Sequence, residues 1–199
     1  MTLRCSPRSR AWMAGLAGLA LLTGCAASPR LFVNREADMT LYKRVAILPF
    51  ANLSSDPYAA ARVTRAFTTE LQISNRFDLV DPSLLLGELE RLNATPDAQG
   101  QIDLAKLRDA AAKVQATAII RGGVSEYSMQ RMGSDEFPVV SFDAEMVDVA
   151  TGLVVWRLSV TESGRSRLPV VGGAGERTFA GVTEQACEKA VRLLREKVL

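Results

Sequence analysis

Two runs in which apolar and polar residues alternate, 139–149 and 153–163, constrain the fold of this 199-residue chain more than any other feature. Alternation with a period of two is typical of a strand that buries one face and exposes the other. The runs are joined by Ala150-Thr151-Gly152, which predicts a tight turn. The two runs therefore predict a long antiparallel hairpin packed on a core through one face.

The rest of the chain predicts strands and helices in alternation. We expect strands at 44–50, 76–81 and 117–129, and helices at 57–74, 82–92, 104–114 and from 178 or 179 to 199. Asp56-Pro57, Asp81-Pro82 and Asp103 are typical helix starts. Gly122-Gly123 predicts a bulge or a close approach of the backbone. The order predicts an α/β fold, a single mixed-sheet sandwich with a parallel start, a long antiparallel hairpin and a closing C-terminal helix.

The N-terminus predicts export and a lipid anchor. A basic start is followed by the apolar run 11–22, which is shorter than the roughly 20 residues of a membrane-spanning helix. Leu22-Thr23-Gly24-Cys25 resembles a bacterial lipobox, which implies cleavage before Cys25 and lipid on that residue. An ordinary secretory signal with a chance cysteine is the alternative.

These features divide the chain into a lipoprotein signal peptide at 1–24, a lipid-anchored tether at 25–43 and a periplasmic α/β domain at 44–199. Positions 26 and 27 are alanine, and the absence of aspartate there favours the outer membrane under the common bacterial sorting rule. The tether carries Pro29 and mixed charges, and it accommodates a short strand near its end.

Composition excludes several kinds of chemistry. The chain has no histidine, which excludes Ser-His-Asp and Cys-His catalysis and histidine-bearing zinc sites. Cys5 lies in the signal peptide and Cys25 is the lipid acceptor, so we expect Cys187 to be a single buried thiol. The first 24 residues hold three of the 24 basic residues and none of the 22 acidic ones. The mature chain is thus close to neutral, which gives no argument for nucleic acid.

Two further patterns point to contacts rather than catalysis. Asn52-Leu53-Ser54 predicts an Asx-type turn after the first strand, and Asn52, Leu53 and Tyr58 form a candidate interaction loop. Carboxylates on the expected strands predict a solvated face, although paired carboxylates also perform glycoside hydrolysis. These carboxylates are Glu126, Asp135, Glu136, Asp143 and Glu145. We predict no catalytic, cofactor-binding or metal-binding residues and no enzymatic activity.

The ordered set of segments resembles a known group of lipoproteins. The run VAILPFANLSSDPYAAARVTRAFTTEL, the strand RFDLVD, the helix LLLGELERL, and the segments KVQATAIIRGGVSEYS and FDAEMVDVATGLVVWRLSVTESG carry the resemblance. Over residues 44–199 they resemble the periplasmic domain of the curli-secretion channel lipoprotein (CsgG) and are similar to the penicillin-binding-protein activator lipoprotein (LpoB). The resemblance implies a lipid-anchored α/β domain that faces the periplasm and acts by protein contact.

One departure from the curli channel favours a non-channel role. In that channel two insertions form membrane-barrel hairpins, but the corresponding stretches 128–141 and 162–180 are short, charged and not alternately apolar. The leading hypothesis is therefore an adaptor or assembly factor that binds an envelope protein, such as a cell-wall synthase or a secretion component. The alternatives are an oligomeric subunit of an outer-membrane secretion channel and a carboxylate-based envelope glycan enzyme. The sequence is compatible with a monomer or a homo-oligomer.

Overall fold

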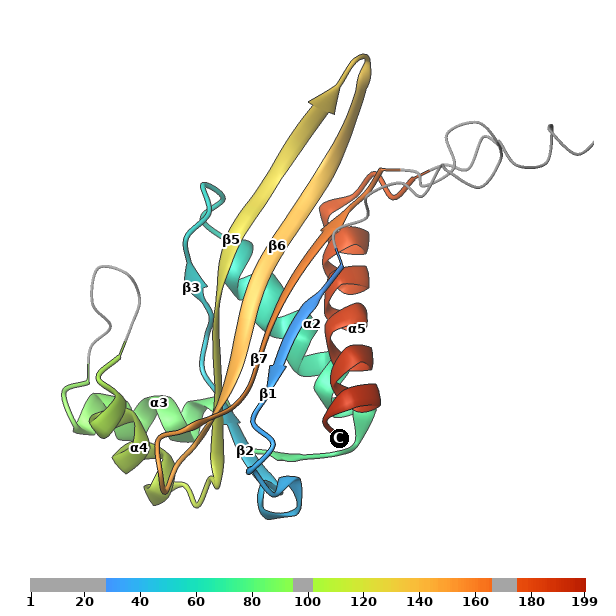
Figure 1. Cartoon of the computed structure of the whole chain (residues 1–199). Helices are drawn as coiled ribbons and strands as arrows, with labels where there is room; N and C mark the ends of the chain where they lie inside the picture. The colour runs from blue at the N-terminus through green and yellow to red at the C-terminus, as the bar shows by residue number, and fades with distance from the viewer. Residues whose placement is uncertain (1–27, 95–101, 166–174) are drawn as a thin grey trace, which may run out of the picture.

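A computed structural model describes residues 28–94, 102–165 and 175–199 (Figure 1). The strands are β1 (Arg30–Val33), β2 (Arg44–Ile47), β3 (Ala51–Asn52), β4 (Asp78–Leu79), β5 (Ala118–Met132), β6 (Asp135–Asp148) and β7 (Val154–Ser163). The helices are η3 (Met39–Leu41, a 3-10 turn), α2 (Ala59–Ser74), α3 (Pro82–Arg91), α4 (Leu104–Lys113) and α5 (Phe179–Lys197). The signal peptide, Cys25 and most of the glycine-rich stretch before α5 lie outside these residues.

The described strands form one mixed sheet in the order β1-β7-β6-β5-β2-β4, with β3 also paired to β5. The contacts of β2 with β4 and β5, and of β3 with β5, are parallel, whereas those of β5, β6, β7 and β1 are antiparallel. This arrangement confirms the predicted α/β fold with a parallel start, an antiparallel hairpin and a closing C-terminal helix.

The two faces of the sheet are covered unequally. Helices α2 and α5 pack on one face and enclose the main core, which includes Phe67, Phe142, Trp156 and Leu194. Helices α3 and α4 pack on the other face, close to β2 and the start of β5, around a smaller core. Among the helices that the structure describes, none covers much of the second face above α3 and α4 (Figure 1).

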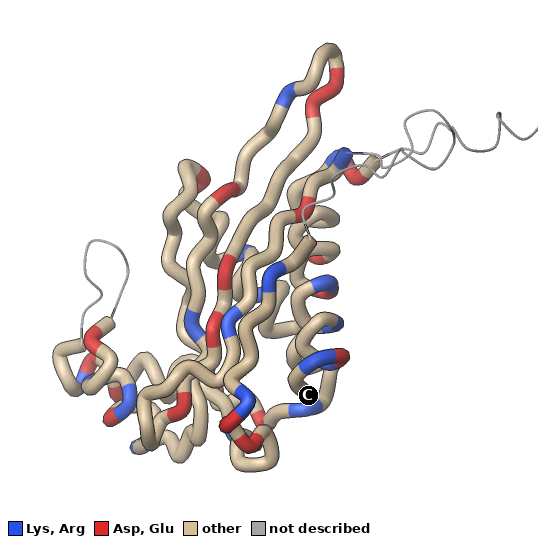
Figure 2. Tube along the Cα trace, in the orientation of Figure 1, with Lys and Arg blue, Asp and Glu red and all other residues tan. Residues whose placement is uncertain are grey.

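The β5–β6 hairpin is longer than the sequence predicts. The two strands continue to Met132 and resume at Asp135, and they project beyond the rest of the sheet (Figure 1). Gly133 has a φ of +65°, which a turn this tight requires. The prediction ended the strands near 129 and 139 because the intervening residues do not alternate between apolar and polar side chains. Charged residues lie at the tip (Figure 2), where none of the described helices covers the hairpin.

Three predicted helix starts are confirmed and one is wrong. The side chains of Asp81, Asp103 and Thr178 accept backbone hydrogen bonds at the first turns of α3, α4 and α5. Helix α2 instead begins at Ala59, after Tyr58. The Asn52 side chain donates to the Asp56 carbonyl (2.8 Å), which holds residues 52–56 in a turn and delays the helix.

The segment expected to be a tether joins the sheet from Arg30 onward. Strand β1 pairs with the outer edge of β7 along its whole length, and η3 follows it. The buried Tyr42 then donates its hydroxyl hydrogen to the Asp148 carboxylate at 2.8 Å. Within the described ranges, no helix has the length and apolarity to cross a membrane.

Candidate interaction surface

The predicted loop after β3 has the expected Asx turn. The Asn52 side-chain oxygen accepts from the Ser54 backbone N–H (3.2 Å) and hydroxyl (2.8 Å). The Asp56 carboxylate accepts from the Tyr58 N–H (2.8 Å) and lies 3.5 Å from the Arg62 guanidinium. Asn52 thus stabilises the loop, and Asp56 connects it to the first turn of α2.

The structure places Leu53 and Tyr58 in different surroundings. Leu53 is 57% exposed and approaches Gly123, on the sheet face that also bears Asp143. Tyr58 is 64% exposed and lies under the guanidinium of Arg62 on the side of α2. The three residues of the candidate loop are close in sequence but do not form a single patch.

Arg62 is the centre of an aromatic cluster at the top of α2. Its guanidinium carbon lies 5.7 Å from the centre of the Tyr58 ring and 5.8 Å from that of Tyr127. Tyr127 stacks on Phe179, the first residue of α5, with ring centres 4.5 Å apart. Tyrosine, phenylalanine and arginine are enriched at protein interfaces because they combine large apolar area with directed polar groups. We call Tyr58, Arg62, Tyr127 and Phe179 the Arg62 cluster.

The sequence contains only part of the signal for this cluster. Tyr58 and Arg62 are four residues apart, so they are neighbours on a helix face once the start of α2 is known. Tyr127 and Phe179 come from distant segments, and only the packing of α5 on the sheet brings them together. The sequence analysis therefore identified Tyr58 and missed the other three.

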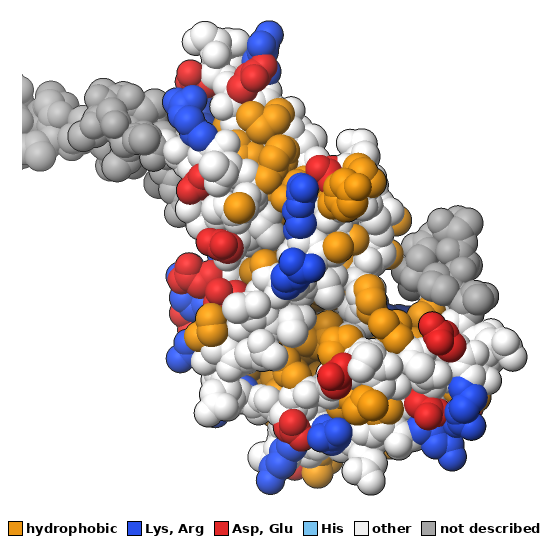
Figure 3. Space-filling view, turned by 180° about the vertical axis from the view of Figure 1, so that it is seen from behind, with side chains coloured by type: hydrophobic (Ala, Val, Ile, Leu, Met, Phe, Trp, Pro, Cys, Tyr) orange, Lys and Arg blue, Asp and Glu red, His pale blue; other side chains and the backbone are white. Residues whose placement is uncertain are grey.

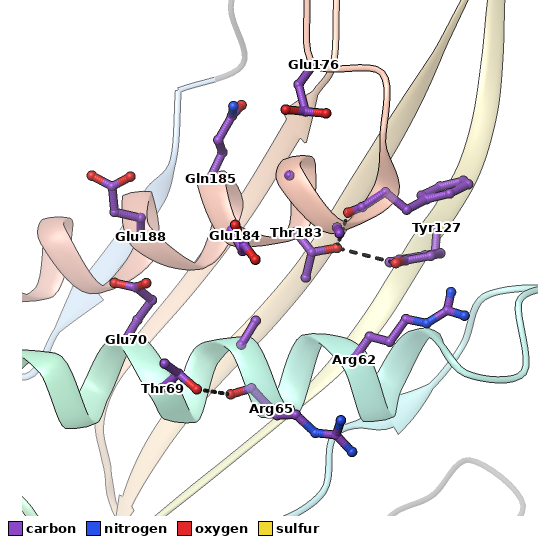
Figure 4. Close-up of a pocket in the computed structure, with 14 residues that line it drawn as sticks. Arg62, Arg65, Thr69, Glu70, Tyr127, Glu176, Thr183, Glu184, Gln185 and Glu188 are labelled. Carbon is purple, nitrogen blue, oxygen red and sulfur yellow. Dashed lines mark hydrogen bonds between the residues drawn. The ribbon is translucent and has the colours of Figure 1, made fainter.

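A groove of about 810 Å³ leads from the Arg62 cluster between α2 and α5 (Figure 4). Arg62 and Arg65 line it from α2, and Glu184 and Glu188 line it from α5. Thr183 is buried at the base, where its hydroxyl donates to the Phe179 carbonyl (2.6 Å) and lies 3.4 Å from the Tyr127 hydroxyl. The groove thus combines an aromatic end with polar walls.

Charged side chains of both signs line the groove. Burial and the negative charges of Glu188 and Glu184 raise the pKa of Glu70, which lies on α2 opposite them. Within the described part of the chain, neither Arg65 nor Glu184 forms an ion pair. Because neither charge is neutralised by another described residue, both are available to a partner with complementary charges.

The projecting hairpin extends this surface. Met129 follows Tyr127 on the same face of β5 and is 48% exposed. Figure 3 shows hydrophobic side chains on the projecting part of the hairpin, below the charged tip. The charge at the tip includes an ion pair between Arg131 and Glu136.

The prediction of a solvated carboxylate face is wrong for Glu145. This residue is only 7% exposed and lies between Arg121 and Arg157, which are its direct neighbours on β5 and β7. Both guanidinium groups form ion pairs with it. Its burial was missed because it depends on the two arginines that lie beside Glu145 on the neighbouring strands. Strand register decides these neighbours, and the sequence of a single strand does not reveal register.

Cys187 is confirmed as a buried thiol. It is fully enclosed between α5 and α2, and burial, together with the charges of Glu70 and Glu184, strongly raises its pKa. A raised pKa keeps the sulfur in the thiol form, which is the less reactive one.

Together, the fold and the surface define a small α/β domain with an open groove and an aromatic cluster suited to contact with another protein. The chain belongs to the family of the peptidoglycan-synthase activator LpoB, whose family model matches residues 20–160. This match supports the sequence resemblance to LpoB, and the comparisons give no support to the resemblance to the curli-secretion channel lipoprotein. No curated protein matches the chain.

Solved structures share the fold at low sequence identity. A PelC dodecamer from Paraburkholderia phytofirmans is 19% identical, with a TM-score of 0.54, and the match covers 82% of this chain and 96% of PelC. Lipoprotein GNA1162 from Neisseria meningitidis is 16% identical, with a TM-score of 0.53, and the match covers 78% of this chain and 99% of that protein. At these identities the likeness concerns the fold alone.

Proposed function

We propose that this protein is a periplasmic lipoprotein, held at the outer membrane by lipid on Cys25, that activates a peptidoglycan synthase by direct contact. Cleavage removes residues 1–24, and the domain from Arg44 onward makes the contact. The protein acts as an adaptor without catalytic residues or a cofactor. The family description, peptidoglycan-synthase activator, supports a synthase as the partner.

The observation that carries this proposal is the Arg62 cluster beside an open groove. A binding surface needs large side chains that are already fixed in place, because ordering them on binding costs free energy. Stacking of Tyr127 on Phe179 fixes the aromatic floor, and Arg62 lies against it. Arg62 retains guanidinium donors for a partner, since its own ion pair with Asp56 is long at 3.5 Å.

The experiment measures binding and stimulation of a purified peptidoglycan synthase from the same bacterium. The expected result is that the wild-type protein binds and increases glycan polymerisation. Arg62→Ala should weaken binding about tenfold or more, as truncation of an interface anchor does. Arg91→Ala is the matched control, because Arg91 is an equally exposed arginine on α3, distant from the cluster.

Two outcomes would contradict the proposal. The partner assignment is wrong if the wild-type protein neither binds nor stimulates the synthase. The surface assignment is wrong if Arg62→Ala and Arg91→Ala behave alike. Because the PelC chain that shares the fold forms a dodecamer, the molar mass in detergent is measured alongside. A ring-sized assembly without synthase binding would favour the secretion-channel alternative.

A further inference from the structure

A second cavity lies on the opposite face of the sheet, between β5–β7 and the pair α3–α4. Its volume is about 530 Å³, within the range of small-ligand sites. One wall is apolar and is formed by Leu48, Pro49, Leu86, Ile102 and Leu107. The sequence predicts Leu86 as part of the buried stripe of α3, but 39% of it is exposed, because it borders this cavity.

The floor of the cavity is a row of charges. Arg121, Glu145 and Arg157 are direct cross-strand neighbours on β5, β6 and β7. Arg121 donates from Nε to Glu145 Oε1 at 2.7 Å, and its Nη2 lies 2.7 Å from the same oxygen in an ion pair. Arg157 donates from Nε and Nη2 to Glu145 Oε2. Each guanidinium has five N–H donors, so at least three on each arginine do not bond to Glu145.

Asp143 adds a negative charge to the cavity. It lines the cavity two residues before Glu145, on the same face of β6. Its carboxylate forms no ion pair with any residue that the structure describes. Asp143 is exposed, but partial desolvation and the charge of Glu145 raise its pKa, while Arg157 partly opposes the rise. A cation placed beside Asp143 would relieve this unfavourable environment.

The spacing of these groups matches the two ends of a dipeptide. Residues i and i+2 of a strand are about 7 Å apart, so the backbone of Asp143 lies about 7 Å along β6 from Glu145 and its two arginine neighbours. Two residues of extended peptide also span about 7 Å. A ligand can therefore place an ammonium on Asp143 and a carboxylate on the outer N–H groups of Arg157 and Arg121. Its side chain then reaches the apolar wall.

We propose that this cavity binds a small zwitterionic peptide of dipeptide length with an apolar side chain. Asp143 holds the ammonium end, Arg157 and Arg121 hold the carboxylate end, and Leu86 and Leu107 contact the side chain. Glu145 does not touch the ligand in this arrangement but positions both arginines. The site lies on the opposite face from the Arg62 cluster, and it does not depend on the proposed function.

Calorimetric titration of the purified full-length protein in detergent with alanyl-leucine tests the proposal. The free dipeptide should bind saturably. N-acetylation of the dipeptide and Asp143→Asn should each lower the affinity about tenfold, a change of about 1.4 kcal/mol. The two changes together should cause no further loss, because they remove the same contact. Amidation of the dipeptide and Arg157→Gln should each lower the affinity, and their combined loss should be less than additive, because amidation removes the carboxylate that Arg157 shares with Arg121.

Arg131→Gln is the matched control, since Arg131 forms an exposed ion pair at the hairpin tip, away from the cavity. It should leave the affinity unchanged. Melting temperatures show whether each variant is folded, and Asp143→Asn should not lower the melting temperature, because the fold disfavours the charged form of Asp143. The proposal is overturned if the dipeptide does not bind saturably. It is also overturned if the acetylated or amidated peptide binds as tightly as the free one, or if the losses in each pair are additive.

Discussion

Gly122 and Gly87 differ in what a methyl group would meet at each position. A Cβ on Gly122 would lie 2.2 Å from the backbone oxygen of Asp143, on the neighbouring strand. At Gly87, in the middle of α3, the same group would meet no atom within 4 Å other than those of its chain neighbours and the adjacent backbone of the helix. Gly122 therefore permits the close approach of β5 and β6 that the Gly122-Gly123 pair predicts, whereas Gly87 only weakens its helix.

This contrast gives a prediction with an internal control. Gly122→Ala should destabilise the protein by about 2 kcal/mol or more, because the strands must separate to admit the methyl group. Gly87→Ala should stabilise it by about 0.5–1 kcal/mol through helix propensity. Urea denaturation of both variants measures the change in free energy of unfolding. Equal effects of the two substitutions would contradict this reading of β5.

Tyr42 gives a prediction of pH dependence. Burial, and then the hydrogen bond and charge of Asp148, raise the pKa of Tyr42 to about 12 from its ordinary value of 10.0. Between these two values the unfolded chain loses the phenolic proton while the folded chain keeps it. The stabilisation is therefore complete below about pH 10 and is lost as the pH rises toward 12. The free energy of unfolding should fall over this range, and it should fall less in Tyr42→Phe.

Chemical denaturation of both proteins at about pH 9 and about pH 11 makes the measurement. Lysine and the other tyrosines titrate in the same range in both proteins. The difference in lost stability between the two proteins therefore reports Tyr42 alone. An identical loss of stability in the wild type and in Tyr42→Phe would show that Tyr42 does not contribute.

At the scale of elements, the β5–β6 hairpin has two parts. The lower part supports the fold, and the projecting part extends the surface. Its lower part carries core residues such as Val124 and Phe142, whereas Met129 and Met132 near the tip are about half exposed. An isolated two-stranded hairpin is only marginally stable in water. The projecting part therefore depends on the lower sheet and contributes little to it.

Replacing residues 129–138 by Asn-Gly tests this division. The new turn joins Ser128 to Val139, which are already cross-strand partners, by a two-residue connection that antiparallel strands favour. The melting temperature should change by no more than about 4 °C, equivalent to about 1 kcal/mol for a domain of this size. Affinity for the synthase should fall, because Met129 is lost from the surface beside the Arg62 cluster. Loss of the folded state would contradict the division.

The sequence predicted the elements with unequal success, for identifiable reasons. The strands at 139–149 and 153–163 were predictable because one face is buried and imposes a period of two on the sequence. The strand residues beyond Met129 were missed because they lack a buried face, and no period marks them. The start of α2 was misplaced because a side-chain hydrogen bond from Asn52, rather than helix preference, decides where the chain leaves its turn.

At the scale of the whole molecule, the proposed anchor determines where the domain works. Cys25 lies only five residues before β1, so the domain would be held close to the membrane surface. The full-length protein should incorporate radiolabelled palmitate and fractionate with the outer membrane. Cys25→Ala should remove the label and release the protein into the periplasm, because one residue carries all the acyl chains. Absence of label on the wild type would refute the anchor and leave the groove and cavity unaffected.

The sequence by itself determined the fold class, the pairing of the strands at 139–149 and 153–163 and the burial of Cys187, because each depends on local apolar patterning. The tertiary structure alone decided which distant side chains meet. It placed Tyr127 against Phe179 and enclosed Glu145 between Arg121 and Arg157. The physical reason is that burial of one face gives the apolar residues of each segment a regular spacing in the sequence. Contacts between segments depend instead on strand register and helix placement, which are fixed only when the whole core packs.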